Sequence, residues 1–323
     1  MKSHILESGS DRIGALDFQT SATKYIPRES TNATLEELLT SADRVDQGIP
    51  LTPELDQALL HESSIGGARP KALINDGEKK FIAKFSSSSD TYDVVKTEFI
   101  AMRLAFLVGL KVAPVQIVKA AGKDVLLIER FDRIKKQDGF ERVMLISALT
   151  LFELDEMVAR HASYQDLAEI IRMRFEDPKA ALRELFKRLV FNVLVGNNDD
   201  HPRNHAALWD GKTLKLSPAY DICPQKRSGR ESNQAMSIFQ QDKTSRIETC
   251  LLASNSFLLS REDAIQIVEE LIKSINHSLS DVCKESGISE ADLSLMKRTQ
   301  FLTDYAFEDL TGMAKKLVLL LKK

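Results

Sequence analysis

The chain has 323 residues and a formal net charge of −3, and 28% of its residues are charged while 43% are hydrophobic. This length predicts about two domains, or two lobes of one unit, and the near-neutral charge provides no broad basic surface for nucleic acid or an anionic membrane. Three cysteines without Cys-x-x-Cys spacing favour neither a disulfide framework nor a zinc knuckle, and no apolar stretch approaches the roughly 20 residues of a membrane span. We therefore expect a cytoplasmic protein that binds neither nucleic acid nor membrane directly.

Residues 1–62 are predicted to form an N-terminal segment with two short helices. Residues 13–18 resemble the close of a strand unit, which suggests that a preceding part is missing. Thr34 and Glu37 form a capping-box pair at the start of one helix, and a Thr-Pro pair opens a second helix near 52–60. Both helices are expected to be scaffold.

Residues 63–133 are predicted to form a small lobe in which strands predominate. Short apolar segments rich in Val, Ile and Phe are typical of strands, and one stretch with helical periodicity interrupts them. We expect strands near 72–74, 81–85, 115–118 and 125–129, and the helix at about 92–107.

Residues 134–323 are predicted to form a larger, helical lobe. Asp177-Pro178 is typical of a helix start, and apolar residues then recur every three or four positions up to Val193. Two later helix starts are indicated by capping pairs, Ser260 with Asp263 and Ser289 with Asp292.

An Asp-rich loop and a hairpin interrupt these helices. The loop reads Gly-Asn-Asn-Asp-Asp-His-Pro from Gly196 to Pro202. The segments 206–209 and 213–216 flank Asp210-Gly211, which predicts a tight hairpin with a type I′ turn. Asp221 follows directly after this hairpin.

Asp199, Asn204 and Asp221 match the pattern that phosphoryl transfer needs. A carboxylate has to orient the attacking hydroxyl, and an amide and a second carboxylate supply the hard oxygen ligands that Mg²⁺ prefers. Asn204 follows Asp199 at the offset of the catalytic Asp and metal-binding Asn in the protein-kinase loop, and Asp221 stands where the second metal-binding Asp would follow. The alternative is that all three residues cap turns, since Asp and Asn are common in loops.

Lys84 lies within an apolar strand, where a buried ammonium group needs a partner. Glu98 on the following helix is the natural one, because kinases hold ATP phosphates with a strand lysine that pairs with a helix glutamate. The alternative is that both side chains are simply solvated. We predict Asp199, Lys84 and Glu98 as the catalytic residues.

Residues 63–71, Ser-Ser-Ile-Gly-Gly-Ala-Arg-Pro-Lys, precede this strand. Gly66 and Gly67 would let backbone N–H groups approach phosphate oxygens, but a plain turn is the alternative, and the segment is not a Walker A loop. Residues 129–132 end the small lobe where a kinase linker offers its backbone to adenine, although a simple connection between lobes explains them equally well.

His201 and His205 are four residues apart and near acidic residues, which raises a zinc site as an alternative. Pro202 argues against a regular helix that would bring both rings to one face, and no third ligand is evident. We expect His201 to order the loop through a hydrogen bond instead.

Together these motifs resemble the HipA-type serine/threonine kinases of bacterial toxin–antitoxin systems. The resemblance implies an α+β, bilobal protein-kinase-like fold with a small β-rich N-lobe and a larger all-helical C-lobe. The resemblance runs from about residue 63 to residue 222. Its most specific segments are 64–71, 81–85, 129–133, 144–150 and 188–205, and the last of these is strongly diagnostic.

The resemblance implies that Asp199 is the catalytic aspartate and that Asn204 and Asp221 hold Mg²⁺. It also implies autophosphorylation of Ser64, with Ser63 as the neighbouring candidate. The residues expected to bind ATP are Ser64, Gly66, Gly67, Ala68, Lys71, Lys84, Glu129, Phe131 and His201.

The same resemblance implies a protein substrate, with aminoacyl-tRNA synthetases among those of the family, and a HipB-like antitoxin that binds DNA through a helix-turn-helix. The short N-terminus suggests that a small HipS-like protein supplies a missing subdomain. Two departures stand out, because Asp221 is followed by Ile222-Cys223 instead of Phe-Gly and no His-Arg precedes Asp199. A catalytically weak scaffold that binds an antitoxin, and a small-molecule or lipid kinase, are the alternatives.

Overall fold

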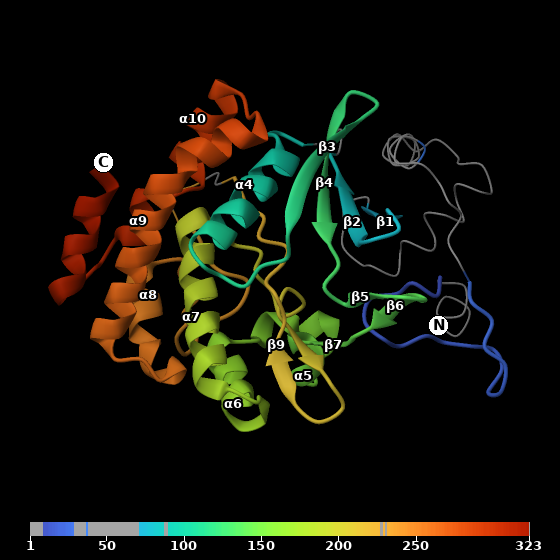
Figure 1. The fold of residues 1–323 in the computed structure, drawn as a ribbon. Coiled ribbons are helices and arrows are strands. Elements are labelled where there is room, and N and C mark those ends of the chain that lie inside the picture. Colours follow the sequence, from blue (N-terminus) through green and yellow to red (C-terminus); the bar gives the residue numbers. More distant parts are fainter. Residues whose placement is uncertain are drawn as a thin grey trace. The chain divides into compact units, whose positions relative to one another are not determined.

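The computed structural model describes residues 9–28, 37, 71–86, 90–226, 229 and 231–322. Both helices expected before residue 62 lie outside these ranges, apart from the helical residue Glu37, and so does the glycine-containing segment 63–70. The chain divides into two compact units (Figure 1). The first unit ends at Lys96 and resumes over Val115–Leu145, and the second holds Thr97–Pro114 and begins again at Ile146.

The first unit contains a four-stranded antiparallel sheet in the order β1-β2-β4-β3. All four strands expected from the sequence are confirmed, because their apolar residues pack on one face around Phe81, Phe85 and Leu127. The β3–β4 connection is Ala121-Gly122, and both residues have positive φ, the pattern of a type I′ turn. The strands are β1 (Lys71–Asn75), β2 (Lys80–Phe85), β3 (Val115–Ala120) and β4 (Lys123–Glu129).

A buried ion network ties the N-terminal segment to the end of this sheet. The guanidinium groups of Arg130 and Arg133, both 1% exposed, lie against the carboxylate of Asp132 at 2.8 and 2.9 Å. Arg130 also donates to the backbone carbonyl of Asp11, and the N–H of Gly14 donates to Asp132 at 2.7 Å. Because buried charges need this kind of pairing, the network fixes residues 11–14 onto the first unit. The hairpin of β5 (Arg133–Lys136) and β6 (Gly139–Arg142) follows, and β7 spans Met144–Ser147.

The second unit is built around the long helix α7 (Pro178–Val195), which packs on α6, α8, η3 and α9 (Figure 1). From Leu189 to Val195 every side chain of α7 is buried, and Asn192 is the only polar residue in this run. The expected helix starts are confirmed, since Asp177, Ser260 and Ser289 each accept a hydrogen bond from a backbone N–H three residues ahead. The remaining elements are α4 (Val94–Leu107), α5 (Ala148–Leu151), η2 (Glu156–His161), α6 (Tyr164–Arg174), β8 (Ala206–Trp209), β9 (Leu214–Leu216), α8 (Ile247–Leu252), η3 (Ser254–Phe257), α9 (Arg261–Ser286), α10 (Glu290–Thr299), η4 (Asp304–Phe307) and η5 (Gly312–Lys322).

The expected hairpin forms from β8 and β9, but its turn type was predicted wrongly. Trp209 pairs with Leu214, so four residues connect the strands and Asp210 does not have the positive φ that a type I′ turn requires. The Asp210 carboxylate instead accepts hydrogen bonds from the N–H groups of Lys212 and Thr213, both at 2.9 Å. Asp210 thus closes the loop through its side chain.

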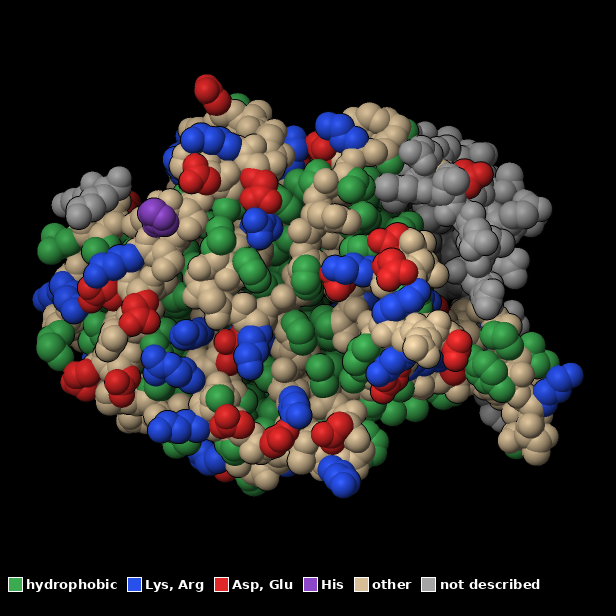
Figure 2. All heavy atoms as spheres, in the orientation of Figure 1, with side chains coloured by type: hydrophobic (Ala, Val, Ile, Leu, Met, Phe, Trp, Pro, Cys, Tyr) green, Lys and Arg blue, Asp and Glu red, His purple; other side chains and the backbone are tan. Residues whose placement is uncertain are grey.

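The described helices include none that is both long and apolar enough to span a bilayer. On the face shown in Figure 2, basic and acidic side chains are interspersed. The mixed composition of helices and strands confirms the predicted α+β class.

Candidate active site

Gly196 ends α7 and starts the loop that carries Asp199 and Asn204. Its φ of 71° is left-handed, and a Cβ at this position would lie 2.6 Å from the backbone oxygen of Gln300. Glycine is therefore needed both for its backbone conformation and for the close approach of a distant segment. The carbonyl of Gly196 accepts from the N–H of Gln225 at 2.9 Å, while the Gln300 side chain donates to Pro224 O at 3.1 Å.

The structure brings Asp199 and Asn204 together within this loop. Asn204 is buried, and its Nδ2 donates to the backbone oxygen of Asp199 at 3.2 Å. Its N–H donates to the carbonyl of His201 at 2.8 Å, so the loop folds back on itself over five residues. The side chain of Asp199 is exposed, which leaves its carboxylate accessible to a substrate.

Tyr220, the residue before Asp221, is hydrogen-bonded to the same loop. The hydroxyl of Tyr220 donates to the backbone oxygen of Arg203 at 2.7 Å, next to Asn204. Asp221 is partly exposed and has a φ of 59°, a left-handed conformation that is uncommon for residues with a Cβ but is tolerated best by Asp and Asn. Backbone strain of this kind concentrates at functional sites.

A buried arginine fixes the segment that precedes Asp221. The guanidinium of Arg188 pairs with Glu184 at 3.0 Å and donates to the carbonyls of Ser217, at 2.8 Å, and Lys111, at 3.1 Å. Ala219 forms two further backbone hydrogen bonds with the segment 111–113. The segment 217–219, just before Asp221, is therefore held by hydrogen bonds from Arg188 and with residues 111–113.

Asp200, next to Asp199, is a functional candidate that the sequence reasoning missed. Only 3% of Asp200 is exposed, and its Oδ2 accepts from Asn192 Nδ2 at 2.8 Å, from His205 Nε2 at 2.9 Å and from the Tyr164 hydroxyl. Burial would raise the pKa of Asp200, but the interactions with His205 and Tyr164 hold it below its ordinary value, so the group is a carboxylate. A signal was present, because a lone Asn192 in the apolar run of α7 requires a polar partner.

The histidines play different parts from those expected. The loop-ordering hydrogen bond that we predicted for His201 is made by His205, through Asp200. The Nδ1 atom of His201 is buried without a hydrogen-bond partner. Within the described ranges, no three His, Cys, Asp or Glu side chains are placed to hold a metal ion, so the zinc alternative finds no support there.

Two of the predicted ATP-binding residues, Lys71 and Lys84, lie on the sheet of the first unit. Lys71 pairs with Lys84 across β1 and β2, and Lys84 pairs with Leu126 across β2 and β4. Residues directly opposite in neighbouring strands share a face, so the two lysines lie side by side on the face away from Phe81 and Phe85. Lys84 is buried with 8% exposure, and Lys71 is half-buried.

The other predicted residues are placed as follows. Glu129 ends β4 with its carboxylate 2.6 Å from Lys79 Nζ, and Phe131 is half-buried just beyond it. Glu98 is buried on α4 in the second unit, so its expected pairing with Lys84 stays a prediction. Ser63, Ser64, Gly66, Gly67 and Ala68 lie outside the described residues.

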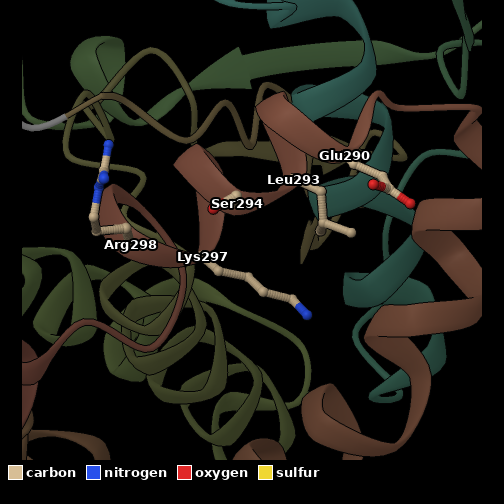
Figure 3. Close-up of a pocket in the computed structure, with 5 residues that line it drawn as sticks. All are labelled: Glu290, Leu293, Ser294, Lys297 and Arg298. Atoms are coloured by element: carbon tan, nitrogen blue, oxygen red, sulfur yellow. The ribbon is translucent and has the colours of Figure 1, made fainter.

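A surface pocket of ≈ 470 Å³ is separate from these residues. It is lined by α10, and none of the predicted site residues contributes to its wall (Figure 3). Its lining residues are Glu290, Leu293, Ser294, Lys297 and Arg298.

Comparisons with known proteins place this fold and site in a family. A model of the HipA-like C-terminal domain matches residues 63–279, which include Asp199, Asn204 and Asp221. Y4mE of Sinorhizobium fredii, named as a presumed kinase, is 28% identical over 200 residues that cover 55% of this chain and 46% of that protein. The serine/threonine-protein kinase toxin HipA of Shewanella oneidensis is 28% identical over 184 residues, 49% of this chain and 42% of the toxin. The matches thus span less than half the length of either relative.

A solved structure shows the same fold over nearly the whole chain. It is the Shewanella oneidensis MR-1 toxin–antitoxin complex of HipA, HipB and operator DNA, with a TM-score of 0.70 at 20% identity. The likeness covers 97% of this chain and 76% of the solved one, and it confirms the predicted kinase-like fold class. Since the family model matches most of the chain, the protein belongs to the HipA-like C-terminal domain family.

Proposed function

We propose that the protein is an ATP- and Mg²⁺-dependent serine/threonine protein kinase. The observation that supports the proposal is the folding of one loop so that Asn204 donates to the backbone of Asp199, together with the hydrogen bond from Tyr220, the residue before Asp221, to Arg203 of that loop. Phosphoryl transfer is catalysed mainly by positioning and electrostatic stabilisation, and these three oxygen-bearing side chains are the types that both tasks use.

Each residue has a distinct part in the proposed reaction. The exposed carboxylate of Asp199 accepts a hydrogen bond from the substrate hydroxyl and orients its oxygen towards the phosphate. Because Asn204 donates through Nδ2, its Oδ1 is the atom left to meet a cation, and Asp221 adds a carboxylate. These are hard oxygen donors and so fit Mg²⁺, which when bound neutralises phosphate charge.

ATP recognition is proposed for the first unit. Lys71 and Lys84 on one face of the sheet offer two ammonium groups to the phosphates, and Leu126 beside them contributes an apolar surface. Glu129 and Phe131 would present backbone atoms to adenine. Further contacts are proposed for Glu98, as the partner of Lys84, and for Ser64, Gly66, Gly67, Ala68 and His201.

We also propose that Ser64, or Ser63 beside it, is the site of autophosphorylation. A phosphoserine adds about −1.5 to −2 charges at neutral pH, so it would repel the ATP phosphates from this segment and lower activity. This mechanism predicts self-limiting activity on incubation with ATP.

The proposed setting is a toxin–antitoxin module. The HipA of the solved complex is bound to HipB and operator DNA, which supports a HipB-like DNA-binding antitoxin as the partner here. A translation component such as an aminoacyl-tRNA synthetase is the proposed substrate, and a small HipS-like protein is a further proposed partner. The proposed location is the cytoplasm.

The test is transfer of label from γ-labelled ATP in the presence of Mg²⁺, first to the protein itself and then to proteins of a bacterial lysate. Wild-type protein should label serine or threonine, and Asp199→Ala should lose about 100-fold or more of the rate. Asp281→Ala is the matched control, because Asp281 is an exposed acid on α9 that lies far along the chain from the loop. Labelled small molecules would point to a small-molecule or lipid kinase, and equal label in Asp199→Ala and wild type would contradict the assignment. Absence of any label would favour the alternative that the protein is a catalytically weak scaffold that binds an antitoxin.

A further inference from the structure

Asp199 and Asn204 are each followed by a buried residue, and these two buried residues contact each other. Asp200 follows Asp199 and His205 follows Asn204, and the Asp200 Oδ2 and His205 Nε2 atoms are 2.9 Å apart. Asp199 is exposed, whereas Asp200 and His205 are buried, with 3% exposure for each of the two. The contact between Asp200 and His205 therefore joins the residue after Asp199 to the residue after Asn204.

Two helices hold the same carboxylate from the other side. Tyr164 is the first residue of α6 and is fully buried, and its hydroxyl donates to Asp200. Asn192 lies in the last turn of α7 and donates to Asp200 through Nδ2 at 2.8 Å. The ring of Tyr164 also contacts the ring of His205 edge-on, with centroids 5.6 Å apart. We name these four residues, Tyr164, Asn192, Asp200 and His205, the Asp200 cluster.

The Asp200 cluster also reaches the beginning of the loop. Because Asn192 points its Nδ2 at Asp200, its Oδ1 faces away and accepts from Asn197 Nδ2 at 3.1 Å. The network thus connects Asn197 at the start of the loop with His205 at its end. Two buried atoms of the network, Asn197 Oδ1 and His205 Nδ1, have no hydrogen-bond partner among the described residues, but its other hydrogen bonds make the local structure rigid, because a displacement would break them in a dry environment.

We infer that Asp200 is a positioning residue for the proposed phosphoryl transfer, acting through His205, Tyr164 and Asn192 to hold Asp199 and Asn204 in register. Asp200 does not touch the reacting atoms in this role, since its Oδ2 is occupied by three protein donors. Outer partners of this kind typically change activity by about 10- to 100-fold when they are removed. The catalytic part of this inference rests on the proposed kinase function.

The experiment compares two substitutions of the same residue. His205→Gln keeps a side-chain N–H donor near the position of Nε2, whereas His205→Ala removes it. We expect His205→Ala to lower kcat for label transfer by about 10- to 100-fold and to raise the Mg²⁺ concentration needed for half-maximal rate, while His205→Gln stays within about threefold of wild type. Asp200→Asn keeps an acceptor oxygen but loses the charge, so its kcat should lie between those of His205→Ala and His205→Gln.

A matched control separates positioning from simple loss of stability. Glu248, in α8, pairs with Arg261 at 2.7 Å and accepts a hydrogen bond from Thr311 at 2.9 Å, and both partners lie outside the loop. Glu248→Gln should lower the melting temperature without changing kcat or the Mg²⁺ requirement. All assays are run on full-length protein well below the melting temperature of each variant.

Backbone amide exchange gives a readout that needs no activity. In Asp200→Asn and His205→Ala, the amides of residues 199–205 should exchange faster, with Glu248→Gln unchanged in this segment. The inference is overturned if folded His205→Ala keeps wild-type kcat, if His205→Gln is as impaired as His205→Ala, or if loop exchange is unaffected. Should wild type show no transfer that depends on Asp199, the kinase function fails, and exchange alone then decides whether Asp200 positions the loop.

Discussion

Lys71 lies directly opposite Lys84 across the antiparallel β1–β2 pair. The phosphates of ATP are the ligand that we propose for these two side chains, which lie on one face of the sheet.

Substitution of these lysines should weaken nucleotide binding more than it weakens the fold. We expect Lys71→Gln and Lys84→Gln each to reduce the thermal stabilisation that Mg²⁺–ATP gives to the protein, and the double variant to abolish it. Lys119→Gln is the control, because Lys119 is an exposed lysine on β3 that pairs with Asp124. Thermal unfolding with and without Mg²⁺–ATP measures the effect, and full stabilisation of the double variant would exclude this binding face.

Gly196→Ala should be strongly destabilising. The substitution places a Cβ in a left-handed residue and 2.6 Å from Gln300 O, so we expect a loss of about 2–4 kcal/mol in unfolding free energy. Gly287→Ala is a matched control, since Gly287 also has a left-handed φ of 61° but has no atom within 4 Å of an added Cβ. Only the conformational cost of about 1 kcal/mol applies there. Urea denaturation of both variants checks the difference, and equal losses would show that the Gln300 contact is unimportant.

The Arg130–Asp132–Arg133 network should make stability depend on acid pH. Burial would raise the pKa of Asp132, but its hydrogen bond and charge interactions with Arg130, and the nearby Arg133, lower it below the ordinary value of 3.8. A carboxyl whose pKa is lower in the folded state stabilises the protein above the unfolded pKa, and this contribution is lost as the pH falls through the folded pKa. We expect urea midpoints of wild type to fall below about pH 4 and those of Asp132→Asn to change less. An equal fall of the urea midpoint with pH in wild type and Asp132→Asn would contradict this role of the Asp132 carboxylate.

The three cysteines should react with a thiol reagent at different rates. Cys250 is fully buried and its pKa is raised by burial, and burial likewise raises the pKa of Cys283 to about 11. Since the thiolate is the reactive form, neither should label quickly in the native protein. Cys223, which is partly exposed and two residues after Asp221, should label first, and Mg²⁺–ATP should slow its labelling. Mass spectrometry of peptides labelled with iodoacetamide measures the order.

The elements were largely predictable because their signals are local. Apolar strand segments identified β1 to β4, and capping residues located the starts of α7, α9 and α10. The Asp199-to-Asn204 spacing likewise suggested a folded loop, which the structure contains. The turn at Asp210-Gly211 shows the limit of such signals, because a side chain that accepts two N–H groups replaced the expected backbone geometry.

Relationships between distant residues could not be predicted from sequence. The pairing of Lys71 with Lys84 depends on the strand register, and the close approach of Gly196 to Gln300 joins two segments of the second unit that are far apart in the sequence. Asp200 was missed for a related reason. Its three donors come from two helices and the far end of the loop, so the adjacent acids Asp199 and Asp200 differ only through their tertiary surroundings.

The contact between Gly196 and Gln300 also has a consequence during synthesis. A ribosome adds roughly 5–20 residues per second, so about 100 further residues, or roughly 5 to 20 s, separate the appearance of the loop from that of the segment that covers it. Leu302 then donates to Leu194 O at 2.7 Å, completing the enclosure of the end of α7. During this interval the nascent chain lacks residues 300–302, and the end of α7 therefore lacks the cover that these residues give it in the finished protein.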